Sequence, residues 1–262
     1  MKKLKPRYII LLIILFVYLL VMYLVVGRDN LRKEKLTTKL IVGNSSVWEL
    51  SNKQWTNIVT SMELKEFSWS FYNIYEDNKD IGKYYLWYDD EEWFVFDKKK
   101  EPINLEGKLL AYQANYKIPL KEFTSEQIND FSKIEKNLSN KNIDIDSELT
   151  VSSFVEIDID NDGNDEVIYL ISNAFPEESD PDEIFTYVFM KKDNSTYVMY
   201  DEREENTGYV GCKPYINYVL DIDEDKKYEI ILSCGKYSDQ RQLDRLLKFE
   251  KEGFKLLIDN NP

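Results

Sequence analysis

The first feature of the hydrophobic pattern is an uninterrupted apolar run from Tyr8 to Val26. The run has no polar face, and no charged residue occurs between positions 8 and 27. A helix of this length would span about 28 Å, close to the ~30 Å hydrocarbon core of a bilayer. The run is also longer than the roughly 7–15 apolar residues of a cleaved signal peptide. It therefore predicts an uncleaved transmembrane signal anchor at residues 8–27, preceded by a cytoplasmic tail at residues 1–7.

The orientation of this anchor follows from its short basic tail. Four basic residues lie in the tail and five in residues 28–40, so counting charges on the two sides does not decide the direction. A short, strongly basic tail resists translocation, and the first helix usually sets the topology. We therefore expect a single-pass membrane protein with a cytoplasmic N-terminus, a polar stalk at residues 28–45 and an extracytoplasmic C-terminal domain.

Two patterns in the remainder predict short helices. Ser51 to Gln54 and Thr124 to Gln127 each place a hydroxyl residue three positions before a glutamine, which is the pattern of a capping box. Apolar residues follow each box at helical spacing. We therefore expect amphipathic helices at about residues 52–64 and 125–138.

Strand and turn patterns dominate elsewhere. Aromatic and β-branched runs separated by short polar turns predict hairpins over residues 84–96, 186–200 and 246–258. The expected fold class is mainly β, with an α+β part at residues 46–140 and a tandem β-repeat domain at residues 141–262.

An internal repeat lies in the second of these parts. Residues 154–170 return in weakened form as residues 217–233, an offset of 63 positions. At this offset four acidic residues align with four others, namely Asp158, Asp160, Asp162 and Glu166 with Asp221, Asp223, Asp225 and Glu229. Each copy is followed by one of the predicted hairpins. The repeating unit therefore has four strands, which is the content of one propeller blade.

The acidic loop of the first copy has the residue types of a calcium site. Asp158, Asp160 and Asp162 occupy alternate positions of a tight turn, and Gly163 can adopt the positive φ that such a turn needs. Calcium takes six to eight oxygen ligands at about 2.3–2.6 Å. An EF-hand is disfavoured because its twelfth position is a tyrosine here. The alternative is a solvated acidic turn without metal, since Asp and Asn are common turn formers.

The motif Asp158-x-Asp-x-Asp-Gly-x-x-Glu166 between apolar strands resembles the calcium loop of FG-GAP/VCBS-type repeats, which occur in integrin-like β-propellers and bacterial surface proteins. The resemblance covers about residues 150–262. It implies a structural Ca²⁺ bound by the side chains of Asp158, Asp160, Asp162 and Glu166 and by the backbone of Asn164. The second loop, with Asp221, Asp223, Asp225 and Glu229, is a weaker candidate because Lys226 replaces the glycine. The part beyond the stalk holds fewer than four units of 63 residues, so we do not expect a closed integrin-like propeller.

Cys212 and Cys234 bracket the second loop. If residues 215–220 and 228–233 pair as a hairpin, both cysteines lie near its open end. A disulfide there would close a loop of ~23 residues and contribute about 3 kcal/mol. The alternative is a pair of buried thiols.

The hairpin with Trp87, Tyr88, Trp93, Phe94 and Phe96 is apolar on both faces. This pattern favours a strand pair buried between two layers. The alternative is a binding platform for a sugar or a peptide.

Composition then limits the functions that remain. The net charge of −14 argues against a nucleic-acid partner, because an acidic domain repels phosphate. The chain has no histidine, which excludes Ser-His-Asp and Cys-His catalysis and histidine-bound zinc. We therefore predict a membrane-anchored cell-surface module for binding or assembly, without catalytic activity, whose partner is an envelope protein or glycan. The alternatives are a glycan hydrolase using two carboxylates and an accessory subunit of a membrane complex.

Overall fold

A computed structural model describes most of the chain after residue 37. The described ranges are residues 38–44, 46–51, 54–58, 61–89, 92–114, 116–143, 149–174, 183–205, 211–236 and 242–260. The predicted tail, the predicted membrane anchor at residues 8–27 and most of the predicted stalk lie outside these ranges. Within them, no helix has both the length and the apolar character needed to cross a membrane.

The first sheet is built by residues 38–113. Its eight described strands are β1 (Thr38–Val42), β2 (Ser46–Ser51), β3 (Gln54–Asn57), β4 (Ser70–Glu76), β5 (Lys79–Asp89), β6 (Glu92–Phe96), β7 (Pro102–Ile103) and β8 (Leu109–Gln113). They lie in the order β3-β2-β1-β8-β4-β5-β6-β7, and each pair of neighbours is antiparallel. Leu40, Ile41 and Val42 of β1 are fully buried. The predicted stalk at residues 28–45 is therefore wrong for residues 38–42, which form a core strand.

Two further antiparallel sheets follow. The second contains β9 (Ser125–Gln127), β10 (Val151–Ile157), β11 (Glu166–Ser172), β12 (Glu183–Lys192) and β13 (Ser195–Glu205). The third contains β14 (Cys212–Leu220), β15 (Glu229–Lys236), β16 (Gln242–Glu250) and β17 (Gly253–Asp259), in that spatial order. The three predicted hairpins are confirmed as the pairs β5–β6, β12–β13 and β16–β17. The mainly β fold class is likewise confirmed.

The two helix predictions are wrong over most of their length. The described parts of residues 52–64 form strand β3 and the start of a one-turn helix, α2 (Ser61–Glu66). In the range 125–138, residues 125–127 form β9, and helix α3 spans only Glu135–Ser139. Strand β3 pairs with β2, and β9 pairs with β10. These tertiary pairings outweigh a local capping signal, which is a weak determinant of structure.

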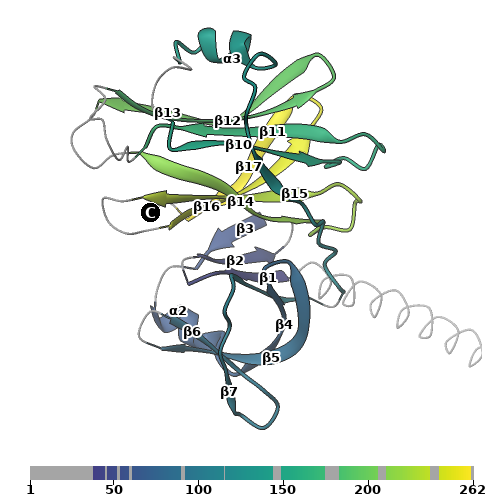
Figure 1. Cartoon of the computed structure of the whole chain (residues 1–262). Helices are drawn as coiled ribbons and strands as arrows, with labels where there is room; N and C mark the ends of the chain where they lie inside the picture. Colours follow the sequence, from purple (N-terminus) through teal and green to yellow (C-terminus); the bar gives the residue numbers. More distant parts are fainter. Residues whose placement is uncertain are drawn as a thin grey trace, which may run out of the picture.

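The sheets stack as layers (Figure 1), with the third sheet between the second and the first. Val188 and Met190 of the second sheet share one core with Ile230 and Leu232 of the third. Ile231, from the other face of the third sheet, shares another core with residues of β1 and β2. Because both of its faces are covered, the successive residues Ile230, Ile231 and Leu232 of β15 are all apolar rather than alternating with polar ones.

Helix α3 covers the outer face of the second sheet (Figure 1). Ile134 and Leu138 pack there in a cluster with Tyr169 and Phe189. Since β9 and α3 belong to the second sheet by pairing and packing, the structural division lies between Gln113 and Ser125, earlier than the predicted boundary at residue 140.

Candidate functional site

The first acidic loop connects β10 to β11, and its own carboxylates shape it. Asp158 accepts hydrogen bonds from the backbone N–H groups of Asp162 and Gly163, both at 3.1 Å. Glu166 accepts one from the backbone N–H of Ile159 at 2.9 Å. Gly163 has a φ of 92°, so the positive φ predicted at this turn is confirmed.

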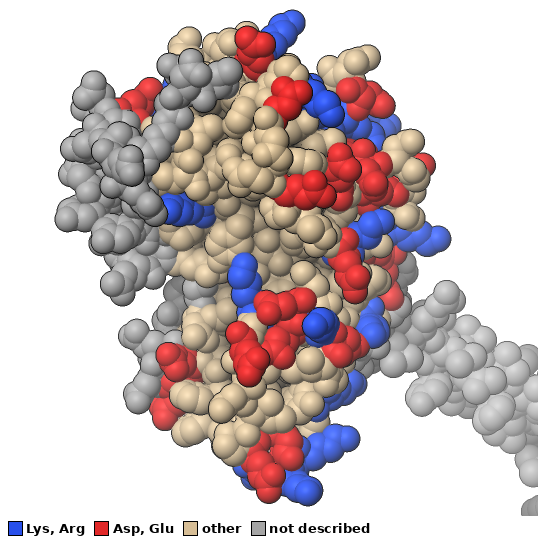
Figure 2. All heavy atoms as spheres, viewed as in Figure 1, with Lys and Arg blue, Asp and Glu red and all other residues tan. Residues whose placement is uncertain are grey.

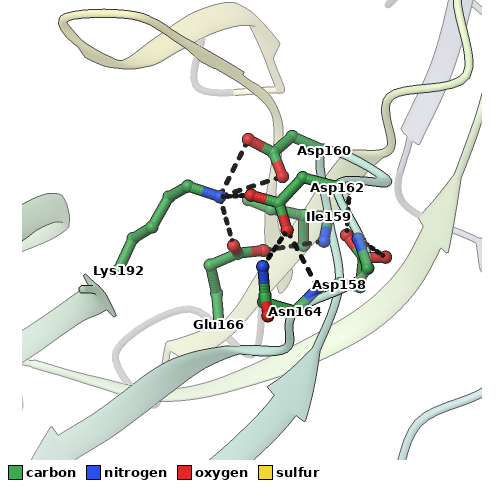
Figure 3. Close-up of polar contacts among 8 residues, drawn as sticks. Asp158, Ile159, Asp160, Asp162, Asn164, Glu166 and Lys192 are labelled. Carbon is green, nitrogen blue, oxygen red and sulfur yellow. Dashed lines mark hydrogen bonds and ion pairs between the residues drawn. The ribbon is translucent and has the colours of Figure 1, made fainter.

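A lysine from another strand lies at the centre of this loop (Figure 3). The Nζ atom of Lys192 is 3.0 Å from Asp160, 2.7 Å from Asp162 and 2.6 Å from Glu166. Lys192 is the last residue of β12, and the pairing of Val167 with Lys191 places it level with Glu166. The loop therefore surrounds an ammonium group supplied by the third strand of the same unit.

The second loop, between β14 and β15, repeats the backbone arrangement. Asp221 accepts hydrogen bonds from the N–H groups of Asp225 and Lys226, both at 3.1 Å. Glu229 accepts one from Ile222 at 2.8 Å. The two loops therefore have the same internal hydrogen bonds at an offset of 63 residues.

The second loop also surrounds a lysine. The Nζ atom of Lys248 is 2.7 Å from Asp223, 2.9 Å from Asp225 and 2.8 Å from Glu229. Lys248 lies in β16 and pairs directly with Glu229 across the sheet. Each copy of the repeat thus brings one lysine of its third strand to three carboxylates of its loop.

The ion pairs perturb the titration of both lysines in the same direction. Burial by itself would lower the pKa of Lys192, but hydrogen bonds to Asp162, Glu166 and Asp160 outweigh burial and raise this pKa. The pKa of Lys248 is raised in the same way, through its contacts with the second loop. Both side chains are therefore held in the charged form.

Burial raises the pKa values of the carboxylates and the lysines lower them, and which effect is larger differs from one carboxylate to another. The hydrogen bond from Lys192 lowers the pKa of Asp162. Burial raises the pKa of Glu229 to about 7, against the opposing effect of Lys248. Burial also raises the pKa of Asp221, whose carboxylate faces the loop backbone.

The donor atoms of the first loop are of the kind that calcium prefers, but their centre is filled. Oxygens of Asp158, Asp160 and Glu166 lie within 4.8 Å of one another. A calcium ion would need to lie at about 2.3–2.6 Å from such oxygens. The Lys192 ammonium lies 2.6–3.0 Å from Asp160, Asp162 and Glu166, so the two cations cannot share this position. With the Lys192 ammonium in this position, the loop does not fit a resident calcium ion. Calcium binding there stays a prediction, and it requires the Lys192 side chain to move out of the loop.

Most of the predicted metal ligands lie close together, but some of them contact the lysine and others contact the loop backbone. Asp160, Asp162 and Glu166 face the lysine, as do Asp223, Asp225 and Glu229 in the second loop. Asp158 and Asp221 instead face backbone amides, and the side chain of Asn164 donates to Asp162 at 3.0 Å. Sequence reasoning missed Lys192 and Lys248. At the 63-residue offset Lys192 aligns with Lys255, which lies in β17 rather than β16.

Cys212 and Cys234 lie on the neighbouring strands β14 and β15 and are joined as a disulfide. Their Cα atoms are 5.3 Å apart, and both side chains are buried. Pro214 pairs with Cys234, so the bond lies at the end of the hairpin opposite the acidic loop, as predicted. The bond and the loop therefore hold the two ends of the same strand pair.

The aromatic hairpin β5–β6 is buried on one face only. Trp93 and Val95 point into the first core, whereas Trp87 and Phe94 belong to the opposite face, where Phe94 is 39% exposed. The prediction that this hairpin lies between two layers is therefore wrong. Trp69, which is 46% exposed, stacks on Trp87 with ring centroids 5.9 Å apart.

Comparisons of the chain with models of protein families, with curated proteins and with solved structures found no match.

Proposed function

We propose that this chain is a membrane-anchored module for binding or assembly on the extracytoplasmic side, without catalytic activity. In this proposal residues 8–27 anchor it, and two blade-like units, β10–β13 and β14–β17, lie beside the first sheet. The observation that carries the proposal is the outer aromatic face formed by Trp69 and strands β4–β6. In this face Trp69 and Phe94 are exposed, and Phe71, Tyr85, Trp87 and Phe96 are half-buried. Trp and Tyr dominate the residues that contribute most to binding at protein interfaces.

The backbone of Trp69 supports a role for this face. Its φ of 57° is in the left-handed region, which is unfavourable for a bulky aromatic residue. Such strain, of order 1–3 kcal/mol, tends to occur at functional sites. The ring of Trp69 contacts Trp87 and Phe96, and the ammonium of Lys100 lies 5.2 Å from its centroid. The strained residue therefore lies at the centre of the exposed ring cluster.

The charge of the chain supports an envelope partner rather than a nucleic acid. The face drawn in Figure 2 carries Asp and Glu in several groups interspersed with Lys and Arg, and the chain has a net charge of −14. Phosphate backbones require a basic surface. We therefore propose an envelope protein or glycan as the partner.

The experiment is cross-linking of the full-length chain in its native envelope, with the protein and glycan products analysed separately. We expect a discrete cross-linked product that is lost when Trp69 and Trp87 are both replaced by Ser. Met62→Ser is the matched control, because it removes another exposed apolar side chain from α2. If the product persists in the Trp69→Ser, Trp87→Ser variant, the aromatic face does not bind the partner.

The direction of insertion has its own test. A reporter that is active only outside the cytoplasm, fused after residue 262, should be active in cells. Activity of a cytoplasmic reporter at the same position would contradict the proposed topology.

The hydrolase alternative requires a carboxyl group with a raised pKa in a cleft away from the repeat loops. Among the described residues the raised carboxyl pKa values belong to Asp221 and Glu229, both in the second loop. Asp221 accepts hydrogen bonds from the loop backbone and Glu229 contacts Lys248, so these groups do not favour hydrolysis. The accessory-subunit alternative depends on the anchor, which lies outside the described residues.

A further inference from the structure

We propose that Lys192 and Lys248 take the place of calcium in this repeat, so that each acidic loop is held by an internal ammonium group and needs no metal. This inference is independent of the proposed function, because it concerns how the chain is stabilised without any partner.

Each ammonium group lies among three carboxylates of its own loop. A lysine has three N–H donors and no acceptor. Lys192 donates a hydrogen bond to each of its three carboxylates, at 3.0, 2.7 and 2.6 Å. Lys248 donates one to Asp223 at 2.7 Å and makes ion pairs with Asp225 and Glu229 at 2.9 and 2.8 Å. The carboxylates of each loop therefore face one internal cation.

The arrangement occurs twice in structurally equivalent positions. Both lysines lie in the third strand of their unit and level with the glutamate that begins the second strand. They are 56 positions apart in sequence, whereas the loops are 63 apart, because the connection between the second and third strands is shorter in the second unit. Two lysines that reach the same place despite different connections indicate a shared structural role.

Burial makes the lysines necessary. Glu166 and Glu229 are each only 1% exposed, and a buried carboxylate requires a partner that balances its charge. The second loop also keeps its shape without the glycine that the calcium-binding pattern contains, since Lys226 occupies that position with a φ of 70°.

The first test measures the full-length chain, purified in detergent, by thermal unfolding with calcium and with a chelator. We expect the same Tm in both, within about 1 °C, and no heat of binding in a calorimetric titration with calcium. A resident site with a Kd near 0.1 mM would instead raise the Tm by roughly 5–10 °C at about 10 mM calcium. Such a rise in the wild-type protein would overturn the proposal.

The second test replaces the lysines by Met, which keeps the length of the side chain and removes its charge. We expect Lys192→Met and Lys248→Met each to lower the Tm by roughly 5–15 °C, because each leaves a buried carboxylate unpaired. Lys191→Met is the matched control, since Lys191 is the preceding residue on the same strand and donates to a backbone carbonyl at the surface.

The two tests decide the proposal together. If Lys192→Met and Lys248→Met have the same Tm as Lys191→Met, the lysines do not hold the loops and the proposal is wrong. If either variant fails to fold while the control folds, the lysine is required and the wild-type titration decides whether calcium is also required. If calcium raises the Tm of Lys192→Met but leaves the Tm of the wild-type protein unchanged, the result supports the proposal that the lysine ammonium occupies the position of a calcium ion.

Discussion

Gly163 and Lys226 occupy the same position in the two loops, and both have left-handed backbones, with φ values of 92° and 70°. Glycine adopts this conformation freely, whereas an L-residue with a side chain pays about 1–2 kcal/mol. The second loop nevertheless keeps both backbone hydrogen bonds to Asp221. A buried carboxylate can therefore hold a backbone conformation that the residue itself disfavours.

Gly211 gives a prediction at this scale. Its φ is 101°, and a Cβ atom there would lie 2.4 Å from a side-chain carbon of Ile184 and 2.8 Å from Cβ of Ala174. Gly211→Ala should lower the free energy of unfolding by about 2–4 kcal/mol, because overpacking adds to backbone strain. Gly235→Ala is the control, since nothing lies within 4 Å of the added carbon. Urea unfolding measures both, and equal stabilities would contradict the packing described around Gly211.

At the scale of elements, the strand pair β14–β15 is held at both ends. The disulfide joins one end, and the acidic loop with Lys248 closes the other. In the first unit only the loop end has such a link, because both cysteines of the chain lie in the second unit. Both units therefore have a lysine that links the third strand to the loop, but only the second unit also contains a disulfide.

The disulfide carries the prediction at this scale. Its sequence separation is 22 residues, so its loss should cost about 3 kcal/mol and lower the Tm by roughly 6–12 °C. The measurement is thermal unfolding with and without a reductant. A variant with both Cys212→Ser and Cys234→Ser serves as control and should be insensitive to the reductant. Recovery of two free thiols from the unreduced exported protein would show that the bond does not form.

At the scale of the whole molecule, a buried polar network joins the third sheet to the first. Asp244 of β16 is fully buried and accepts hydrogen bonds from Ser46 of β2 at 2.6 Å and Gln242 at 2.7 Å. The side chain of Asn260 also donates to Ser46, at 2.7 Å. Because buried polar groups require partners, this network fixes how the two sheets sit against each other.

Asp244→Ala tests the network. We expect a loss of about 3 kcal/mol in the free energy of unfolding, since several buried donors lose their acceptor. Asp259→Ala is the comparison, because Asp259 makes a loose ion pair of 3.9 Å with Arg245 and such pairs contribute about 0–1 kcal/mol. Denaturant unfolding distinguishes the two variants, and a loss for Asp244→Ala no larger than for Asp259→Ala would exclude a structural role for the network.

The parts of the fold that could be predicted are those whose causes are local. The hairpins at residues 84–96, 186–200 and 246–258 were recognisable because alternation and turn residues lie within a few positions of one another. The helix predicted at residues 52–64 failed because its residues satisfy their backbone by pairing with β2. That pairing depends on a neighbouring strand and on the sheet around it. A capping pattern covers only a few adjacent residues and contains no information about either.

The sequence by itself determined the apolar run at residues 8–27, the positions of most strands and the gathering of carboxylates on two equivalent loops. Only the tertiary structure decided which cation faces those carboxylates and which face of β5–β6 is open. The physical reason is the distance along the sequence between the residues that interact. Side-chain alternation and turn formation depend on adjacent residues, whereas the approach of Lys192 and Lys248 depends on strand register across loops of different length.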